Sequence, residues 1–243
     1  MTADLHITCI MPVRDGAAFI GNALDSIVRQ SRPVERIIVI DDGSCDDSAA
    51  VARAHPAAAK VISIAPSGPG AARNAGLAQC NRGLVAFLDA DDLWHPDKIL
   101  LQLECLARRP ETGICLSAFD NIADPPLLPG VTDWRSTQLG VDRRTPLLSA
   151  ALVRSAACAR VGGFDTSLYP FGEDSDWFLR CRAAGIATAR LDQVLVQRRL
   201  HLGNLTRRFD NNARADTAFA VITEHLARKR LAQPPQLQPA GSQ

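Results

Sequence analysis

Residues 6–119 alternate short apolar runs with amphipathic helical patterns, and this alternation is the strongest constraint on the fold. Apolar runs rich in β-branched residues predict strands at 6–13, 36–44, 60–65, 83–90 and 113–119. Helical spacing between them predicts helices at 17–30, 46–55, 71–80 and 96–108. Strands that alternate with helices pair in parallel and are covered on both faces. We therefore predict a Rossmann-like α/β domain with a mainly parallel sheet flanked by helices.

Polar segments follow four of these predicted strands. They are Arg14-Asp15, Asp41-Asp42-Gly43, Ser67 to Gly70 and Asp89 to Asp92. In an open parallel sheet, ligands bind in the crevice beyond the carboxyl ends of the strands. The sequence therefore predicts a ligand site at this edge of the sheet.

The regular alternation ends near residue 120. Residues 120–142 are rich in proline, aspartate and glycine and predict a long loop or lid. A mixed region follows, with a helix expected at 173–185 and one or two strands at 187–204. We expect one domain over 1–206, with halves at 1–119 and 120–206, and a C-terminal helix and disordered tail over 207–243.

Composition excludes several classes of function. The 243 residues carry a formal net charge of +1, which gives no support for a nucleic-acid partner. The seven cysteines include no C-x-x-C pair, so zinc and redox motifs are not indicated. No apolar run is long enough to span a membrane, and the N-terminus lacks a basic leader, so we expect a cytoplasmic location.

The stretch "AFLDADDLWHPDK" (86–98) combines an apolar strand with an acidic turn. Asp89 and Asp91 follow the strand directly and could converge on a hard divalent cation such as Mn²⁺ or Mg²⁺. Asp97 follows a proline and is typical of a helix start. Asp92 fits either the turn or the site.

Two further segments have both structural and functional interpretations. Asp41 and Asp42 could accept hydrogen bonds from a base or ribose, or could belong to a turn whose Ser44 caps the next helix. The glycines of "PSGPGAARNAG" (66–76) suggest a dinucleotide loop, but Arg73 stands where that motif needs Gly or Ala. The loop would still bring Arg73 and helix N–H groups near phosphates.

The second half offers a candidate base and a candidate ligand. Glu173, Asp174 and Asp176 lie at or near a helix start, where acids stabilise the dipole or, at a cleft edge, act as a general base. His201, in "HLGN", follows a strand, and an isolated histidine of this kind is usually structural.

Taken in order, these segments resemble the family 2 glycosyltransferases, which have the GT-A fold. The matching pieces are "ITCIMPVRDGAAFIGNALDSIVRQ", "ERIIVIDDGSCDDS", "GPGAARNAGL", "GLVAFLDADDLWHPDKI", "VGGFDTSLYPFGEDSDWFLR" and "HLGN". They cover most of residues 6–206. Processive synthases of the family carry Q-x-x-R-W and membrane helices, whereas "VQRRLHLGN" has no tryptophan, so we expect transfer of one or a few sugars.

The resemblance implies an inverting, metal-dependent transfer from a nucleotide-diphosphate sugar, with a UDP-sugar expected, to an unidentified acceptor hydroxyl. Residues 1–119 would bind the donor, and 120–206 would face the acceptor. The implied donor-binding residues are Pro12, Val13, Asp15, Asp41, Asp42, Gly70, Arg73, Asp89 and Ala90. Asp89 and Asp91, with His201, would hold Mn²⁺ or Mg²⁺, and Asp174 would be the general base, with Glu173 as the second choice.

Other interpretations remain open from the sequence. "VAFLDADDL" also resembles the opening of haloacid dehalogenase phosphatases, although Asp92-Leu93 replaces their usual Gly-Thr or Gly-Val. A non-catalytic nucleotide-sugar-binding protein would keep Asp42 and the metal pair without depending on Asp174. Peripheral attachment to a membrane is compatible with the sequence.

Overall fold

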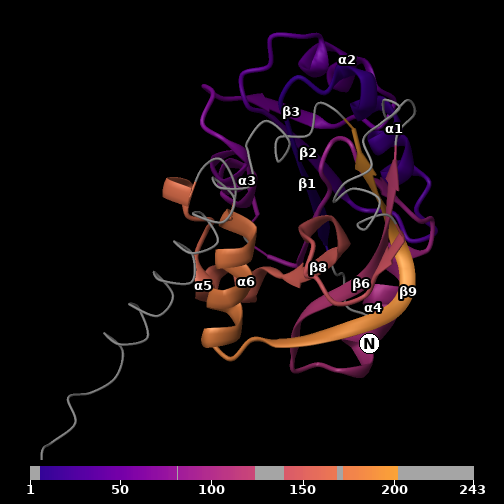
Figure 1. The fold of residues 1–243 in the computed structure, drawn as a ribbon, viewed down its shortest axis with the longest axis vertical. Helices are drawn as coiled ribbons and strands as arrows, with labels where there is room; N and C mark the ends of the chain where they lie inside the picture. The colour runs from indigo at the N-terminus through magenta and orange to yellow at the C-terminus, as the bar shows by residue number, and fades with distance from the viewer. Residues whose placement is uncertain (1–5, 81, 124–139, 169–171, 202–243) are drawn as a thin grey trace, which may run out of the picture.

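The computed structural model of the chain describes residues 6–80, 82–123, 140–168 and 172–201. Within these residues nine strands form one sheet in the order β3-β2-β1-β4-β8-β6-β9-β5, and β7 pairs with β6 (Figure 1). The strands are β1 (Ile7–Val13), β2 (Arg36–Asp41), β3 (Lys60–Ser63), β4 (Leu84–Phe87), β5 (Leu93–Trp94), β6 (Thr112–Ala123), β7 (Gly140–Asp142), β8 (Ala151–Arg154) and β9 (Ala187–Leu200). The α-helices are α1 (Ala17–Val28), α2 (Ser48–Ala54), α3 (Pro69–Leu77), α4 (Lys98–Arg108), α5 (Ser155–Val161) and α6 (Glu173–Ala183).

The first half forms the expected parallel sheet. β1 pairs in parallel with β2 on one side and with β4 on the other, and β2 pairs in parallel with β3. Because these four strands run the same way, their carboxyl ends lie at one edge. The predicted polar loops therefore meet there.

The second half is mixed. β8 is antiparallel to both β4 and β6, whereas β6 and β9 are parallel. The expected boundary between residues 119 and 120 falls inside β6, so one strand belongs to both halves. Residues 120–123 and 140–142, predicted as loop, are strand residues that lengthen β6 and form β7. The remaining predicted loop (124–139) and the predicted tail (207–243) lie outside the described residues.

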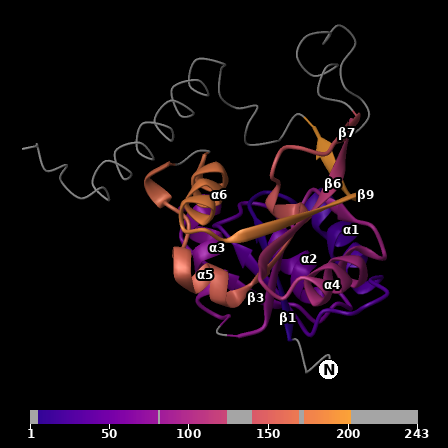
Figure 2. The same ribbon diagram turned by 90° about the horizontal axis from the view of Figure 1, so that it is seen from below.

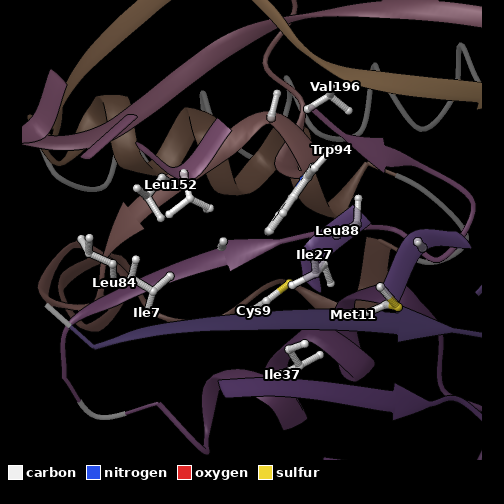
Figure 3. Close-up of a cluster of buried hydrophobic side chains, with 14 of the residues drawn as sticks. Ile7, Cys9, Met11, Ile27, Ile37, Leu84, Leu88, Trp94, Leu152 and Val196 are labelled. Atoms are coloured by element: carbon white, nitrogen blue, oxygen red, sulfur yellow. The ribbon is translucent and has the colours of Figure 1, made fainter. Parts of the chain in front are cut away.

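Alternation along the strands divides the core into two layers. Every second side chain of β1, β2 and β4 faces α1, α2 and α4, in a cluster that includes Cys9, Ile37 and Trp94 (Figure 3). The intervening side chains of the same strands face α3, α5 and α6, in a cluster that includes Phe87 and Trp177. The two helix groups lie on opposite sides of the sheet in Figure 2.

Element ends differ from the sequence-based expectations in a few places. Ser44 is not a helix cap, because α2 begins four residues later and Asp47 holds the cap position. Asp97 does precede α4, at its cap position but without a side-chain cap bond. β5 was not expected, since it has only two residues and depends on pairing with the distant β9. No helix among the described residues is long and apolar enough to cross a bilayer.

Candidate active site

The loops after β1 and β2 are bonded to each other at the carboxyl edge. Asp15 is exposed, with φ of 52°, and its carboxylate accepts a bond of 2.7 Å from the Cys45 amide. Its own amide donates to Ser44 Oγ at 3.0 Å. Asp15 therefore shapes this part of the edge. Pro12 and Val13 are buried at the end of β1, where the Val13 carbonyl accepts the Asp42 amide at 2.8 Å.

Asp42 joins the loop after β2 to the loop after β3. Its buried carboxylate accepts the backbone amides of Ser67, at 2.7 Å, and Gly68, at 2.9 Å. Arg14 Nη1 lies 4.0 Å away. Asp41 is also buried and accepts the Ser44 amide at 3.1 Å. Each Asp42 oxygen keeps acceptor capacity beyond its one amide bond, because a carboxylate offers about four acceptor positions.

Gly43 allows this turn to form. Its φ of +67° lies in the left-handed region, and a Cβ there would overlap the ring of Pro66. A residue with a side chain would therefore separate the two loops that Asp42 joins.

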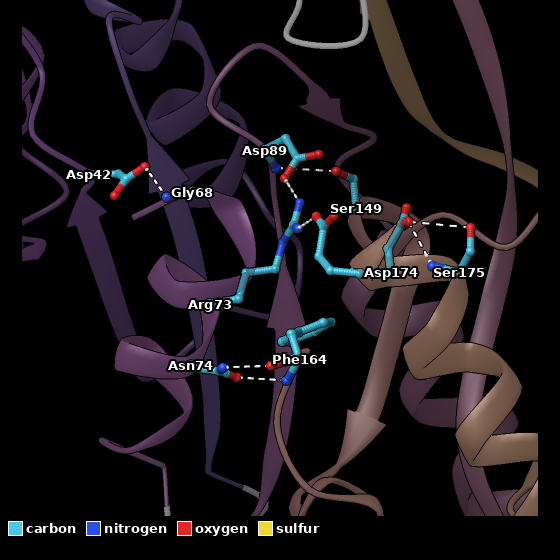
Figure 4. A network of polar contacts seen from close by, with 10 residues as sticks. Asp42, Gly68, Arg73, Asn74, Asp89, Ser149, Phe164, Asp174 and Ser175 are labelled. Atoms are coloured by element: carbon cyan, nitrogen blue, oxygen red, sulfur yellow. Dashed lines mark hydrogen bonds and ion pairs between the residues drawn. The ribbon is translucent and has the colours of Figure 1, made fainter. Parts of the chain in front are cut away.

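Arg73 is the centre of the site (Figure 4). Its Nη1 donates to Glu173 Oε1 at 2.7 Å, and its Nη2 donates to Asp89 Oδ1 at 2.8 Å. Arg73 as a whole is 5% exposed, and within the described residues its Nε has no hydrogen-bond partner. One arginine thus connects α3 to the end of β4 and to the first turn of α6.

The charges of this cluster depend on one another. Burial opposes the charge of Arg73, but Asp89 and Glu173 outweigh it and raise the pKa of Arg73. Burial raises the pKa of Glu173, and the adjacent Arg73 opposes that rise. Gly70 packs against the same acid, since a Cβ at Gly70 would lie 3.3 Å from Glu173 Cγ. Gly70 and Glu173 are therefore close-packed.

The three aspartates after β4 have different surroundings. Asp89 is held by Arg73, and its amide donates to Ser149 Oγ at 3.1 Å. Ala90 is 8% exposed and belongs to the core cluster that faces α1. Asp91 Oδ2 lies 2.9 Å from His201 Nε2, and both side chains are partly exposed. The structure thus brings together the second aspartate of the D-x-D and the predicted histidine.

Asp92, which the sequence left between turn and site, is a buried structural acid. It is 2% exposed, and its Oδ1 accepts the Arg199 amide at 3.2 Å. Burial, followed by the neighbouring Asp91 and Asp89, raises the pKa of Asp92 well above its usual range. The acid therefore bonds the end of β9 to the segment that carries the D-x-D.

The residues present suit a divalent cation at Asp91 and His201. Within the described residues, no group of three or more His, Cys, Asp or Glu side chains converges as a complete cation site. Asp91 and His201 supply one carboxylate and one imidazole in direct contact, and diphosphate oxygens of a donor could complete such a set. The observed pair fits a cation that is shared with a ligand.

The two candidate bases in α6 lie in different environments. Glu173 is buried against Arg73, whereas Asp174 is partly exposed and accepts the Ser175 amide at 2.7 Å. Asp176 is fully buried and bonds Arg180 Nε at 2.7 Å, which makes it part of the helix packing. Asp174 is the most accessible of the three acids.

Two residues that form hydrogen bonds in or beside the site were not predicted from the sequence. Ser149 bonds the Asp89 amide, but it comes from the irregular second half, where no pattern marked it. Asn74 bonds both main-chain polar groups of Phe164, and its position beside Arg73 in "ARNAG" was an available signal.

Comparison with known proteins places this geometry in a family. The model of glycosyl transferase family 2 matches residues 8–159, and the chain belongs to this family. A glycosyltransferase of Nostoc sp. of uncharacterized activity is 33% identical over 114 residues, covering 45% of this chain and 35% of its own. The succinoglycan biosynthesis protein ExoU of Rhizobium meliloti is 35% identical over 101 residues, covering 40% and 29%. The chain thus matches only part of these relatives.

Solved structures share the fold. The S. aureus TarS fragment 1–349, solved with UDP, superposes with a TM-score of 0.69 at 17% identity, over 96% of this chain and 67% of its own. The mannosyltransferase PcManGT of Pyrobaculum calidifontis, solved with GDP-Man and Mn²⁺, has a TM-score of 0.64 at 21% identity, over 96% and 67%. The expected GT-A fold is confirmed. The family match also favours the transferase interpretation of "VAFLDADDL" over the phosphatase one.

Proposed function

We propose that the protein is an inverting glycosyltransferase that moves a sugar from a nucleotide-diphosphate sugar to an acceptor hydroxyl. The observation that carries the proposal is the Asp89–Arg73–Glu173 bridge at the carboxyl edge of the sheet. This bridge brings the D-x-D turn, the buried guanidinium of Arg73 and α6, the helix that carries the candidate base, into one site. The succinoglycan role of the ExoU relative and the nucleotide ligands of the two solved structures are consistent with it.

In this proposal the donor lies along the carboxyl edge. Pro12 and Val13 border the base, and Asp42, beside Asp41, accepts hydrogen bonds from the base or ribose. Asp15 and Gly70 shape the surrounding loops through the contacts described above. Asp89 and Ala90 lie below the ribose and diphosphate. UDP is the proposed nucleotide, as in the TarS fragment, whereas PcManGT was solved with GDP-Man.

Asp91 and His201 would hold Mn²⁺ or Mg²⁺, with Asp89 beside them. When bound, the metal would supply positive charge to offset that of the departing diphosphate. Arg73 supplies permanent positive charge at the same edge, because a guanidinium is protonated throughout the physiological pH range, and Asp89 and Glu173 raise its pKa further. Within the described residues its Nε is buried and has no hydrogen-bond partner, so a ligand oxygen could use this donor only after the side chain moves.

Asp174 is the proposed general base. It takes the proton of the acceptor hydroxyl while that oxygen bonds to the anomeric carbon and the carbon–diphosphate bond breaks. Attack opposite the leaving group inverts the anomeric centre without a covalent intermediate. Glu173 is less suited to this role, because Arg73 occupies its carboxylate.

For the acceptor and the cellular setting we propose only a general class. Synthesis of a cell-surface polysaccharide or glycoconjugate in the cytoplasm fits the succinoglycan relative. The first experiment is a screen of UDP-, GDP- and dTDP-sugars for donor hydrolysis with Mn²⁺ present. Turnover of a UDP-sugar is expected, and failure of every nucleotide sugar to bind or react would overturn the proposal.

Two substitutions separate binding from chemistry. We expect Asp91→Asn to abolish Mn²⁺-dependent UDP binding and Asp174→Asn to preserve binding while stopping transfer, as measured by calorimetry and by UDP release. Asp97→Asn, six residues beyond Asp91 and with a side chain 46% exposed, is the control and should change neither. Unchanged UDP affinity in the Asp91 variant would refute the metal assignment. Binding without transfer in the unmodified protein, over a broad range of acceptors, would indicate a non-catalytic binding module.

A further inference from the structure

The side chain of Asn74 uses both ends of its amide on the main chain of one residue. Its Nδ2 donates to the Phe164 carbonyl at 2.8 Å, and its Oδ1 accepts the Phe164 amide at 2.7 Å (Figure 4). The two residues are 90 positions apart in the sequence. This pair of bonds reproduces what a neighbouring strand would provide, between a helix and a segment that has no strand partner there.

Gly163 makes the contact possible. A Cβ at this position would overlap Asn74 Oδ1, so any side chain would push the amide away from Phe164. The glycine is therefore needed for close approach between α3 and the segment that follows α5.

The ring of Phe164 packs in the core, so the Asn74 bonds connect α3 to core side chains. The ring lies 5.5 Å from the ring of Trp177 in α6, nearly stacked, and 5.8 Å from Phe87 in β4, edge-on. The guanidinium carbon of Arg73 lies 5.8 Å from the centre of the same ring. A residue held at its backbone by α3 thus packs against α6 and against the strand that ends at Asp89.

Consecutive residues of α3 therefore bind the α6 region at two points. Arg73 bonds Glu173 in the first turn of α6, and Asn74 bonds Phe164 before that helix. The Arg73 bond is an ion pair between two buried charged groups. The Asn74 bonds are neutral and directional, so they hold Phe164 independently of that ion pair.

We infer that Asn74 is a positioning residue, which fixes the first turn of α6, and with it Asp174, against the end of β4. The inference rests on the proposed transfer reaction, in which Asp174 is the base. Loss of the Asn74 bonds should misplace that base while the donor-binding edge, formed by the loops after β1 to β4, stays intact.

The kinetic test compares Asn74→Ala with the unmodified protein. We expect kcat to fall at least about tenfold, since a small misplacement of a base is costly. The KM for the donor should change by less than about twofold, because the lost bonds do not touch the donor edge. Asn22→Ala, on the exposed side of α1, is the matched control and should leave both constants unchanged. A normal kcat, or a rise in KM alone, would overturn the inference.

Asn74→Asp provides a rescue that a purely structural role would not show. A protonated aspartic acid donates and accepts as the amide does, whereas its carboxylate would face the Phe164 carbonyl. We therefore expect the kcat of N74D, relative to the unmodified protein at each pH, to recover as the pH is lowered. A constant ratio across pH would contradict positioning through these bonds.

A double-mutant cycle tests the contact itself. Gly163→Ala and Asn74→Ala should each lower Tm, by about 4–8 °C if two hydrogen bonds are lost. In the Asn74→Ala background the added methyl meets no amide, so Gly163→Ala should then cost much less. Additive losses of Tm would mean that the two residues do not interact.

Hydrogen exchange separates failure of this inference from failure of the proposed function. Amides of the first turn of α6 should exchange faster in Asn74→Ala than in the unmodified protein. If the unmodified protein transfers no sugar, the proposed function fails, and this exchange still decides whether Asn74 fixes α6. If the protein is active and exchange is unchanged, the inference fails alone.

Discussion

At the scale of single residues, the site depends on one arginine with two acidic partners in a buried setting. A guanidinium can bond two carboxylates at once through separate nitrogens, which a lysine ammonium does with less directional control. Both acids would be left without a counter-charge if Arg73 were removed. Stability and function are therefore linked at this position.

Arg73→Met should lower the free energy of unfolding by about 3–5 kcal/mol, because it leaves a buried carboxylate unpaired. Urea denaturation followed by circular dichroism measures the change. Arg29→Met, which removes an exposed ion pair to Asp25 at the end of α1, is the matched control and should cost less than about 1 kcal/mol. Equal losses in the two variants would show that the bridge contributes no more than a surface pair.

Lys98 should make the stability of the fold rise with pH, whereas a cation whose charge the fold stabilises would make it fall. It is fully buried, with Nζ 2.9 Å from Gln102 Oε1 and over the ring of Trp94, and burial lowers the pKa of Lys98 to about 7. Between about pH 7 and its unfolded pKa near 10.5, the unfolded chain binds a proton that the folded protein does not. Stability from this group therefore rises with pH over that window and is lowest below it.

The stability of the unmodified protein should thus gain up to about 1.4 kcal/mol per pH unit relative to Lys98→Met between pH 7.5 and 9.5. Urea unfolding of both proteins at several pH values gives this difference, and the comparison cancels the titration of other groups. A difference that is flat across the window would mean that Lys98 stays charged in the fold.

At the scale of elements, the start of α1 and the end of β9 meet beside the D-x-D turn. The ring of Phe19 lies 4.3 Å from that of His201, and the guanidinium carbon of Arg199 lies 5.3 Å from the same phenylalanine. The backbone of Arg199 is bonded to Asp92. These contacts orient the imidazole toward Asp91.

Phe19→Ala should weaken Mn²⁺-dependent UDP binding by about tenfold or more, as expected for loss of a contact that orients the proposed metal ligand His201. Calorimetric titration of UDP at fixed Mn²⁺ measures this. Phe178→Ala removes an aromatic contact with Trp177 in α6 and is the control, which should affect stability but not the metal dependence. Unchanged affinity in the Phe19 variant would separate the ring contact from the metal site.

The sequence predicted most of the elements, for reasons that can be seen in particular ones. β1 and β2 are continuous runs of buried apolar residues, and their parallel pairing follows from the helices between them. β5 could not be predicted, because its two residues gain strand geometry from β9, about a hundred positions away. The same limit hid Ser149, whose role depends on packing beside Asp89 rather than on any local pattern.

At the scale of the whole molecule, one sheet runs through both halves, and its two faces carry separate core clusters. Trp94 lies in one cluster and Trp177 in the other. Residues of adjacent positions in β1, β2 and β4 contribute to both clusters. Neither cluster can lose its packing without exposing strands that the other needs.

We therefore expect a single cooperative unfolding transition. Variants that keep only Trp94 or only Trp177, with the other two tryptophans changed to phenylalanine, should show the same fluorescence midpoint in urea. A matching midpoint from circular dichroism would confirm two-state behaviour. Separated midpoints would show that the two faces, or the two halves, unfold independently.

The length of β9 sets the position of His201. The strand runs from Ala187, beyond the end of α6, to Leu200, and its fourteen residues lie against the twelve of β6 with irregular register. Insertion or deletion of two residues within it would keep every side chain on its original face of the sheet. Such a change would nevertheless move the histidine by about 7 Å, away from Asp91. We therefore expect length changes to be accepted in the connections between elements but not in this strand.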